Sequence, residues 1–130
     1  MTMTHEANQL EIERLEGAFA ICKVEDYTLA NLDAPFCFAC KTDHEHSLVC
    51  SENDIPGNAT HIDGGWRAFR VRGQLDFALT GILAGIATVM ADASIGIFAV
   101  STHDTDYVLV KADQFERAAN ALERAGYKMI

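Results

Sequence analysis

Strand-like and helix-like segments follow one another in the second half of the chain, and their order constrains the fold more than any other feature. Segments rich in β-branched or alternating apolar residues predict strands, and apolar residues at every third or fourth position predict helices. The strands are residues 66–72, 95–100, 107–111 and 127–130, and the helices are residues 76–92 and 113–125. The order β-α-β-β-α-β is the ferredoxin-like plan of an α+β domain.

The first half of the chain predicts an incomplete copy of the same plan. It offers several strand patterns but only a short helical pattern, and residues 51–65, which include Pro56 and paired glycines, are typical of a linker. The strand patterns lie at residues 10–15, 18–24, 36–42 and 47–50, and the helical pattern lies at residues 26–32. We therefore expect an N-terminal half, residues 1–60, and a complete C-terminal domain, residues 61–130.

The negative charge of the chain lies entirely in its first half. The net charge is −9, and residues 1–65 hold 12 acidic and 3 basic residues. Such a surface repels polyphosphates, so nucleic acid and anionic membranes are poor partners. Residues 1–9 lack a signal-peptide pattern, and the longest weakly polar stretch, residues 77–91, is shorter than the roughly 20 residues that span a bilayer. Four cysteines without an export signal predict reduced thiols and a cytoplasmic protein.

Several motifs of the second half resemble a single known family. They are Trp66, Gly73-Gln74-Leu75-Asp76-Phe77, Thr80-Gly81-Ile82-Leu83 and the segment Ile97–Tyr107, which contains Ser101-Thr102 and Thr105-Asp106-Tyr107. The chain resembles the tandem ACT-domain family of small bacterial proteins, which is related to the ACT repeats of aspartate kinases and to the CASTOR arginine sensors. The first half is similar more loosely, through residues 17–20 and 42–50.

The resemblance implies an ACT domain in residues 61–130 and an ACT-like half in residues 1–60. It also implies a regulatory module that binds a small molecule, most simply an amino acid, and that controls a separate enzyme in trans. The chain departs from the family pattern at two places. His103 stands where an aromatic residue is usual, which favours a ligand with a polar or anionic side chain, and His44-Glu45-His46 interrupts the first half's motif.

The candidate ligand site lies between residues 73–77 and the turn at residues 101–106. The carboxylate of an amino acid suits free backbone N–H groups at a helix N-terminus, and Gly73 allows a close backbone approach. The ammonium group suits a carboxylate, either Asp76 or Asp106. Alternatively, these two aspartates only cap the helix and the turn. With the turn positions that the resemblance to the arginine sensors implies, the candidate residues are Gly73, Gln74, Leu75, Asp76, Phe77, Ser101, Thr102, His103 and Asp106.

Catalysis and metal binding have little support in the sequence. We find no nucleophile–base pair, so we expect no enzymatic activity and no cofactor. Cys37-Phe38-Ala39-Cys40 has the spacing of a zinc or redox motif, but strand alternation places its two cysteines on opposite faces. The pair His103-Asp104 resembles part of a metal phosphohydrolase site, yet the predicted helices supply no further ligands. We therefore expect no metal.

The helix expected at residues 76–92 carries small residues opposite its core stripe. These residues are Gly81, Ala84, Gly85 and Thr88, and no charge interrupts the helix. A helix that is uncharged all round is usually buried on both sides. We expect another helix to pack there, from the N-terminal half or from a second chain, and we favour a homodimer. The alternative function is accordingly a dimerisation or interaction module without a ligand.

Overall fold

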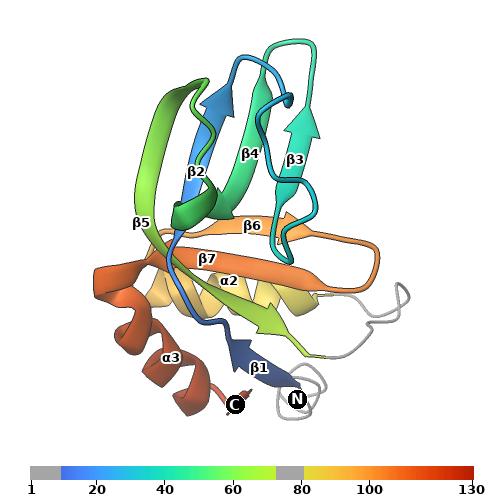
Figure 1. Cartoon of the computed structure of the whole chain (residues 1–130). Helices are drawn as coiled ribbons and strands as arrows, with labels where there is room; N and C mark the ends of the chain where they lie inside the picture. The colour runs from blue at the N-terminus through green and yellow to red at the C-terminus, as the bar shows by residue number, and fades with distance from the viewer. Residues whose placement is uncertain (1–9, 73–80) are drawn as a thin grey trace. The chain divides into compact units, whose positions relative to one another are not determined.

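The computed structural model describes residues 10–72 and 81–130, which form two compact units (Figure 1). The helical unit, as we call it, takes in the chain up to Glu16 together with Arg67–Ile130. The strand unit is Gly17–Trp66. The sequence suggested a division near residue 60, whereas the structure groups the described N-terminal residues with the C-terminal part of the chain. Each unit is described below by itself.

The helical unit has the expected ferredoxin-like order of elements. The order is the C-terminal part of β5 (Ala59–Val71), α2 (Ile82–Asp92), β6 (Phe98–Ser101), β7 (Asp106–Lys111), the 3-10 turn η2 (Ala112–Gln114), α3 (Phe115–Arg124) and β8 (Lys128–Met129). β7 pairs with both β5 and β6. The α+β, ferredoxin-like fold predicted from the sequence is thereby confirmed.

An additional strand from the N-terminus belongs to the same unit. β1 (Glu11–Arg14) pairs antiparallel with β5, with Ile12 opposite Val71, and parallel with β8, with Ile12 opposite Met129. β1 therefore lies between β5 and β8. The sequence indicated a strand here but not its neighbours, because pairing between segments far apart in the chain leaves no local pattern.

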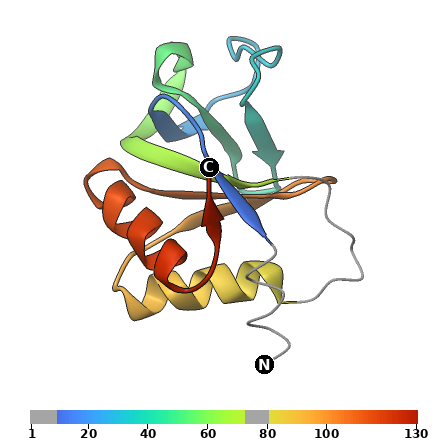
Figure 2. The same cartoon turned by 90° about the horizontal axis from the view of Figure 1, so that it is seen from below.

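The core of the helical unit lies between its strands and its two helices. Figure 2 shows α2 and α3 on one face of the strands of this unit. The rings of Phe69 on β5 and Phe115 on α3 stack with their centroids 4.4 Å apart. Each buried side chain of this size stabilises the fold by about 1.5–3 kcal/mol relative to an exposed one. The fully buried members of this core include Ile12, Phe69, Val71, Ile86, Met90, Val108, Val110, Phe115 and Leu122.

Helix α2 begins later than the sequence predicted. The helix expected from Asp76 starts at Ile82, because Gly81 adopts a left-handed conformation with φ 80° and does not continue a helix. Residues 73–80 lie outside the described residues. Gly81 is therefore the residue that precedes the helix, and its predicted role in packing a helix face is wrong.

Gly85 packs against its own unit rather than against another helix. A Cβ atom added at Gly85 would lie 2.9 Å from the hydroxyl oxygen of Tyr127, the buried residue that follows α3. The covering group at this position is thus a tyrosine of the same unit, and the expectation of a further helix is wrong here. Ala84 and Thr88, the neighbouring small residues of α2, are exposed.

The strand unit contains a small sheet and no α-helix among its residues, all of which the structure describes. Its strands are β2 (Phe19–Val24), β3 (Phe38–Lys41), β4 (His46–Ser51) and the N-terminal part of β5, in the order β3-β4-β2-β5, with the 3-10 turn η1 (Glu52–Asp54) after β4. Alanine and cysteine side chains supply much of its core, which includes Ala20, Cys22, Val24, Leu48 and Cys50.

The short helix predicted at residues 26–32 is absent, and turns replace it. Asp26 accepts hydrogen bonds from the backbone N–H and the hydroxyl of Thr28, at 3.0 and 2.6 Å. A further turn is closed by the bond from the Ala30 N–H to the Tyr27 carbonyl, at 3.2 Å. Aspartate side chains that bond to a backbone N–H two residues on favour turns over helices, which explains the error.

The linker predicted at residues 51–65 is mostly structured, because β5 begins at Ala59. Phe19 pairs with Trp66 and Ile21 with Asp63, so both glycines, 64 and 65, oppose Ala20 in a bulge. Gly65 has φ +76°, and its N–H donates to the Glu52 carboxylate at 2.6 Å. Paired glycines favour a loop in the sequence, but here they provide the left-handed conformation that a strand bulge needs.

The β3–β4 and β6–β7 hairpins match each other residue for residue. Phe38–Lys41 corresponds to Phe98–Ser101, and His46–Ser51 corresponds to Asp106–Lys111. Each hairpin leads into a three-residue 3-10 turn. Their registers agree as well, since Lys41 opposes His46 and Ser101 opposes Asp106. The two hairpins therefore have the same lengths and the same register.

We predict that Gly85→Leu destabilises the helical unit, because the new side chain must displace the Tyr127 hydroxyl. Overpacking of this kind typically costs about 1–3 kcal/mol. Urea denaturation should show the loss, and Gly96→Leu is the matched control, since Gly96 is exposed with open space around its Cβ position. Equal stability of the two variants would contradict the packing of Gly85 on Tyr127.

Candidate ligand-binding site

Hydrogen bonds between Thr102 and Thr105 close the turn between β6 and β7, which carries four of the predicted site residues. The Thr102 N–H donates to the Thr105 carbonyl at 2.8 Å. The Thr102 hydroxyl donates to the same carbonyl at 3.0 Å and accepts from the Thr105 N–H at 3.4 Å. Ser101 and Asp106 form the last strand pair before the turn. The structure therefore brings Ser101, Thr102, His103 and Asp106 together.

Ser101 and Asp106 face each other across the mouth of this turn. The Ser101 hydroxyl donates to a carboxylate oxygen of Asp106 at 2.6 Å. Within residues 10–72 and 81–130, this is the only hydrogen bond to that carboxylate. Ser101 is exposed and Asp106 is half-buried. The carboxylate is thus oriented by one neighbour while it keeps further acceptor capacity, which suits it to bind a cation.

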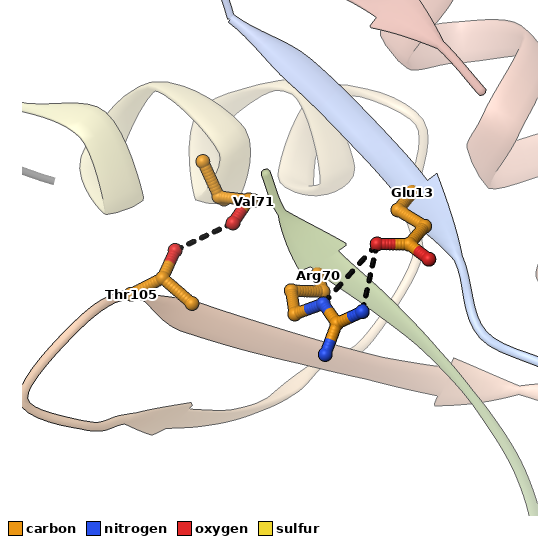
Figure 3. Close-up of polar contacts among 4 residues, drawn as sticks. All are labelled: Glu13, Arg70, Val71 and Thr105. Atoms are coloured by element: carbon orange, nitrogen blue, oxygen red, sulfur yellow. Dashed lines mark hydrogen bonds and ion pairs between the residues drawn. The ribbon is translucent and has the colours of Figure 1, made fainter. Parts of the chain in front are cut away.

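Thr105 attaches the turn to the end of β5. Its side chain is buried, and its hydroxyl donates to the Val71 carbonyl at 2.6 Å (Figure 3). Val71 is the last residue of β5, and Gly73 follows it by two positions. The turn therefore lies beside the point from which the chain enters residues 73–77. The remaining candidate residues, Gly73, Gln74, Leu75, Asp76 and Phe77, lie outside the described residues.

Arg70 is engaged by its neighbours on the strand face opposite Val71. Its Nε and Nη2 groups both donate to one carboxylate oxygen of Glu13, at 3.2 and 2.9 Å (Figure 3). Its guanidinium carbon lies 6.0 Å from the ring centre of Tyr107. The hydrogen bond to Tyr107 is the largest cause that raises the pKa of Arg70, and the hydrogen bond to Glu13 is the next largest. Arg70 and Glu13 therefore form a cross-strand pair between β5 and β1.

His103 and Asp104 form an exposed pair at the tip of the turn. The His103 Nδ1 atom lies 2.8 Å from an Asp104 carboxylate oxygen, and the side chains are 80% and 64% exposed. At this exposure the pair contributes little to stability. His103 therefore lies at the exposed tip of the turn, beyond the Ser101–Asp106 pair.

The four cysteines are free thiols in contrasting environments. Cys37 is half-buried against the core of the strand unit, whereas Cys40 is exposed on β3. Cys22 and Cys50 are buried. Burial of the Cys50 thiol is the main cause that raises its pKa to about 12, and the neighbouring Cys22 is the second cause. Among the residues that the structure describes, no group of three or more His, Cys, Asp or Glu side chains is arranged to hold a metal ion.

Thr105→Val is expected to destabilise the helical unit by about 1–3 kcal/mol, because the buried Val71 carbonyl loses its donor. The matched control is Thr102→Val, which removes an exposed hydroxyl whose bonds water can replace, and its loss should be smaller. Thermal or urea unfolding measures both. Equal losses would mean that the Thr105 hydroxyl does not hold the turn to β5.

The thiols should react with iodoacetamide in an order set by their burial. Near neutral pH, Cys40 should be alkylated first, and Cys22 and Cys50 only after denaturation, because a raised pKa keeps a thiol protonated and the thiolate is the nucleophile. Peptide mass spectrometry identifies the modified residue, and protein denatured in guanidinium chloride is the control. Alkylation of native Cys50 as fast as Cys40 would contradict the buried thiol pair.

Comparisons with known proteins agree with the geometry of the helical unit. A family model described as an ACT domain matches residues 61–124. A solved structure of the protein Atu0741 from Agobacterium tumefaciens is 30% identical, covers 93% of this chain and 92% of its own, and has a TM-score of 0.83. No curated protein matches the chain.

Two solved structures at lower identity share the fold alone. VC0802 from Vibrio cholerae is 15% identical with a TM-score of 0.73, and each chain is 96% covered. The aspartate kinase of Clostridium acetobutylicum is 15% identical with a TM-score of 0.63 over 90% of this chain and 34% of its own.

The helices offer no further functional clue. Within the described residues, no helix is long and apolar enough to cross a membrane. The chain belongs to the same family as the Agobacterium protein, and its residues 61–124 match the ACT-domain model.

Proposed function

We propose that the chain is a regulatory module that binds an α-amino acid between residues 73–77 and the β6–β7 turn. One observation carries the proposal, namely the turn that Thr105 fixes to the end of β5 with the Asp106 carboxylate at its mouth. ACT domains are regulatory and often bind amino acids, and this family assignment supports the same role here. The fold is also shared with an aspartate kinase that is described as allosteric.

The chemistry of the site matches the two charged ends of an amino acid. The Asp106 carboxylate, oriented by Ser101, is the acceptor for the ammonium group. In this proposal, backbone N–H groups of Gly73–Phe77 are the donors for the carboxylate. His103 at the tip of the turn contacts the ligand's side chain, so we propose a polar or anionic one. Thr102 shapes the turn rather than binding through its hydroxyl, which already bonds to Thr105.

The regulated activity belongs to a separate enzyme in this proposal. The fraction of the module that holds an amino acid rises with the concentration of that amino acid, and the bound module acts on its partner enzyme in the cytoplasm. The ACT-domain match and the candidate site support this assignment. The alternative is an interaction or dimerisation module without a ligand, and the exposed small residues of α2 favour an interaction surface in either case.

We propose that this face forms a homodimer. Ala84, Thr88 and Ala91 are exposed on one side of α2, and no charged side chain interrupts the row. Small residues permit close approach of a second helix, and a two-fold axis would bring two identical rows together. The dimer would then place a regulatory surface beside each ligand site.

A thermal-shift screen against the common amino acids should identify a stabilising ligand. At 100 times its dissociation constant, a ligand stabilises the fold by about 2.7 kcal/mol, which raises the melting temperature by several degrees. Asp106→Ala should abolish the shift with little loss of stability. Asp104→Ala is the matched control and should retain it, because Asp104 pairs with His103 at the exposed tip.

Two results would count against the ligand proposal. The first is that no amino acid raises the melting temperature. The second is that Asp106→Ala leaves the thermal shift intact while Asp104→Ala removes it. The first result favours the ligand-free module, and the second moves the ammonium acceptor to the tip of the turn.

Thr88→Arg should convert the dimer to a monomer, because two like charges would meet across the two-fold axis. Light scattering measures the mass, and Asn120→Arg on the exposed side of α3 is the control that should leave it unchanged. A monomeric parent protein, or a Thr88→Arg variant that remains dimeric, would show that α2 does not form the interface.

A further inference from the structure

We propose that the strand unit contains a second copy of the ligand turn and that Tyr27 fills it, so that the chain binds a single amino acid. This inference rests on the proposed function of the β6–β7 turn. It assigns a role to Tyr27 and His46, two residues that neither the family match nor the proposed site uses. Every contact that carries it lies within the strand unit.

The two turns are closed by the same bonds. In the strand unit, the Thr42 N–H donates to the Glu45 carbonyl at 2.9 Å, and the Thr42 hydroxyl accepts from the Glu45 N–H at 3.2 Å. Thr102 and Thr105 make the equivalent bonds in the β6–β7 turn, at 2.8 and 3.4 Å. His46 therefore stands where Asp106 stands in the proposed ligand site.

The strands that precede the two proposed ligand-binding segments also correspond. β4 pairs with β2 as β7 pairs with β5, so the segment after Val24 at the end of β2 is the counterpart of residues 73–77 after β5. Tyr27 lies in that segment, three positions beyond Val24. In the strand unit, both this segment and the β3–β4 turn lie within the described residues.

Tyr27 occupies that space with its ring. The rings of Tyr27 and His46 meet edge to face with centroids 5.3 Å apart. The Tyr27 hydroxyl donates to the Ser47 carbonyl at 2.9 Å, which fixes the ring across the start of β4. Burial is the main cause that raises the pKa of Tyr27. The loop that carries it is held by Asn58, whose side-chain amide donates to the Asp26 carbonyl and carboxylate, each at 3.2 Å.

The charges at the mouth of this turn also differ from those of the proposed site. Lys41 and His46 form the last strand pair, in place of Ser101 and Asp106. An imidazole beside a lysine is a poor acceptor for an ammonium group. The Tyr27 ring beside the turn and the absence of a carboxylate at the position of Asp106 both act against amino-acid binding. The β3–β4 turn therefore keeps the geometry of the β6–β7 turn without the groups proposed to bind the ligand.

Equilibrium dialysis of the full chain against a radiolabelled mixture of the common L-amino acids tests the inference. We expect saturation at one bound amino acid per chain, and no binding to Asp106→Ala. Two bound per chain, with one retained in Asp106→Ala, would overturn the inference and leave the proposed function standing. No binding to the parent chain would overturn the proposed function and this inference with it.

Histidine proton NMR separates the two turns directly. Addition of the same mixture should shift the ring resonances of His103 and leave those of His46 in place; the reverse would overturn the inference. Tyr27→Leu should move the His46 resonances by removing the ring, whereas Tyr27→Phe should largely preserve them. If the His46 ring resonances are unchanged in Tyr27→Leu, the Tyr27 ring does not occupy the space beside the β3–β4 turn.

Discussion

Strand β5 is the constraint on which the rest of the structure depends, because its 13 residues serve both units. Its first part pairs with β2, and its last part pairs with β1 and β7. The change of partner follows the bulge at Gly64 and Gly65, which the Glu52 carboxylate holds through the Gly65 N–H. The same strand ends at Val71, whose carbonyl accepts the Thr105 hydroxyl. One strand therefore pairs with strands of both units, and its last residue anchors the turn of the candidate site.

The site combines a rigid base with accessible polar groups. Thr105 is buried and bonded to β5, and Thr102 closes the turn, so the backbone of the turn has little freedom. Ser101 and His103, by contrast, are exposed, and Asp106 is half-buried. Such an arrangement suits recognition of a small ligand, because binding need not order the groups that contact it. The strand unit repeats the rigid base but replaces the polar mouth with Lys41, His46 and the Tyr27 ring.

Local patterns in the sequence predicted the helical unit well, because helix and strand periodicity depend on neighbouring residues. They could not predict that β1 lies between β5 and β8, nor that paired glycines would form a bulge inside a strand rather than a linker. The helix expected at residues 26–32 failed because Asp26 binds the Thr28 backbone. At the site, the resemblance implied Ser101 and Asp106 as ligand contacts, which stay predictions, and no sequence pattern indicated that buried Thr105 anchors the turn. A threonine between polar residues gives no sequence indication of burial.

Hydrogen–deuterium exchange of the full chain shows whether an amino acid binds at residues 73–77 and the β6–β7 turn. Exchange is compared with and without the amino acid that gives the largest thermal shift. The account predicts slower exchange in peptides that cover residues 73–77 and 101–106, and unchanged exchange in those that cover residues 26–28 and 42–46. Protection confined to the β3–β4 turn, or uniform exchange across the chain, would contradict it.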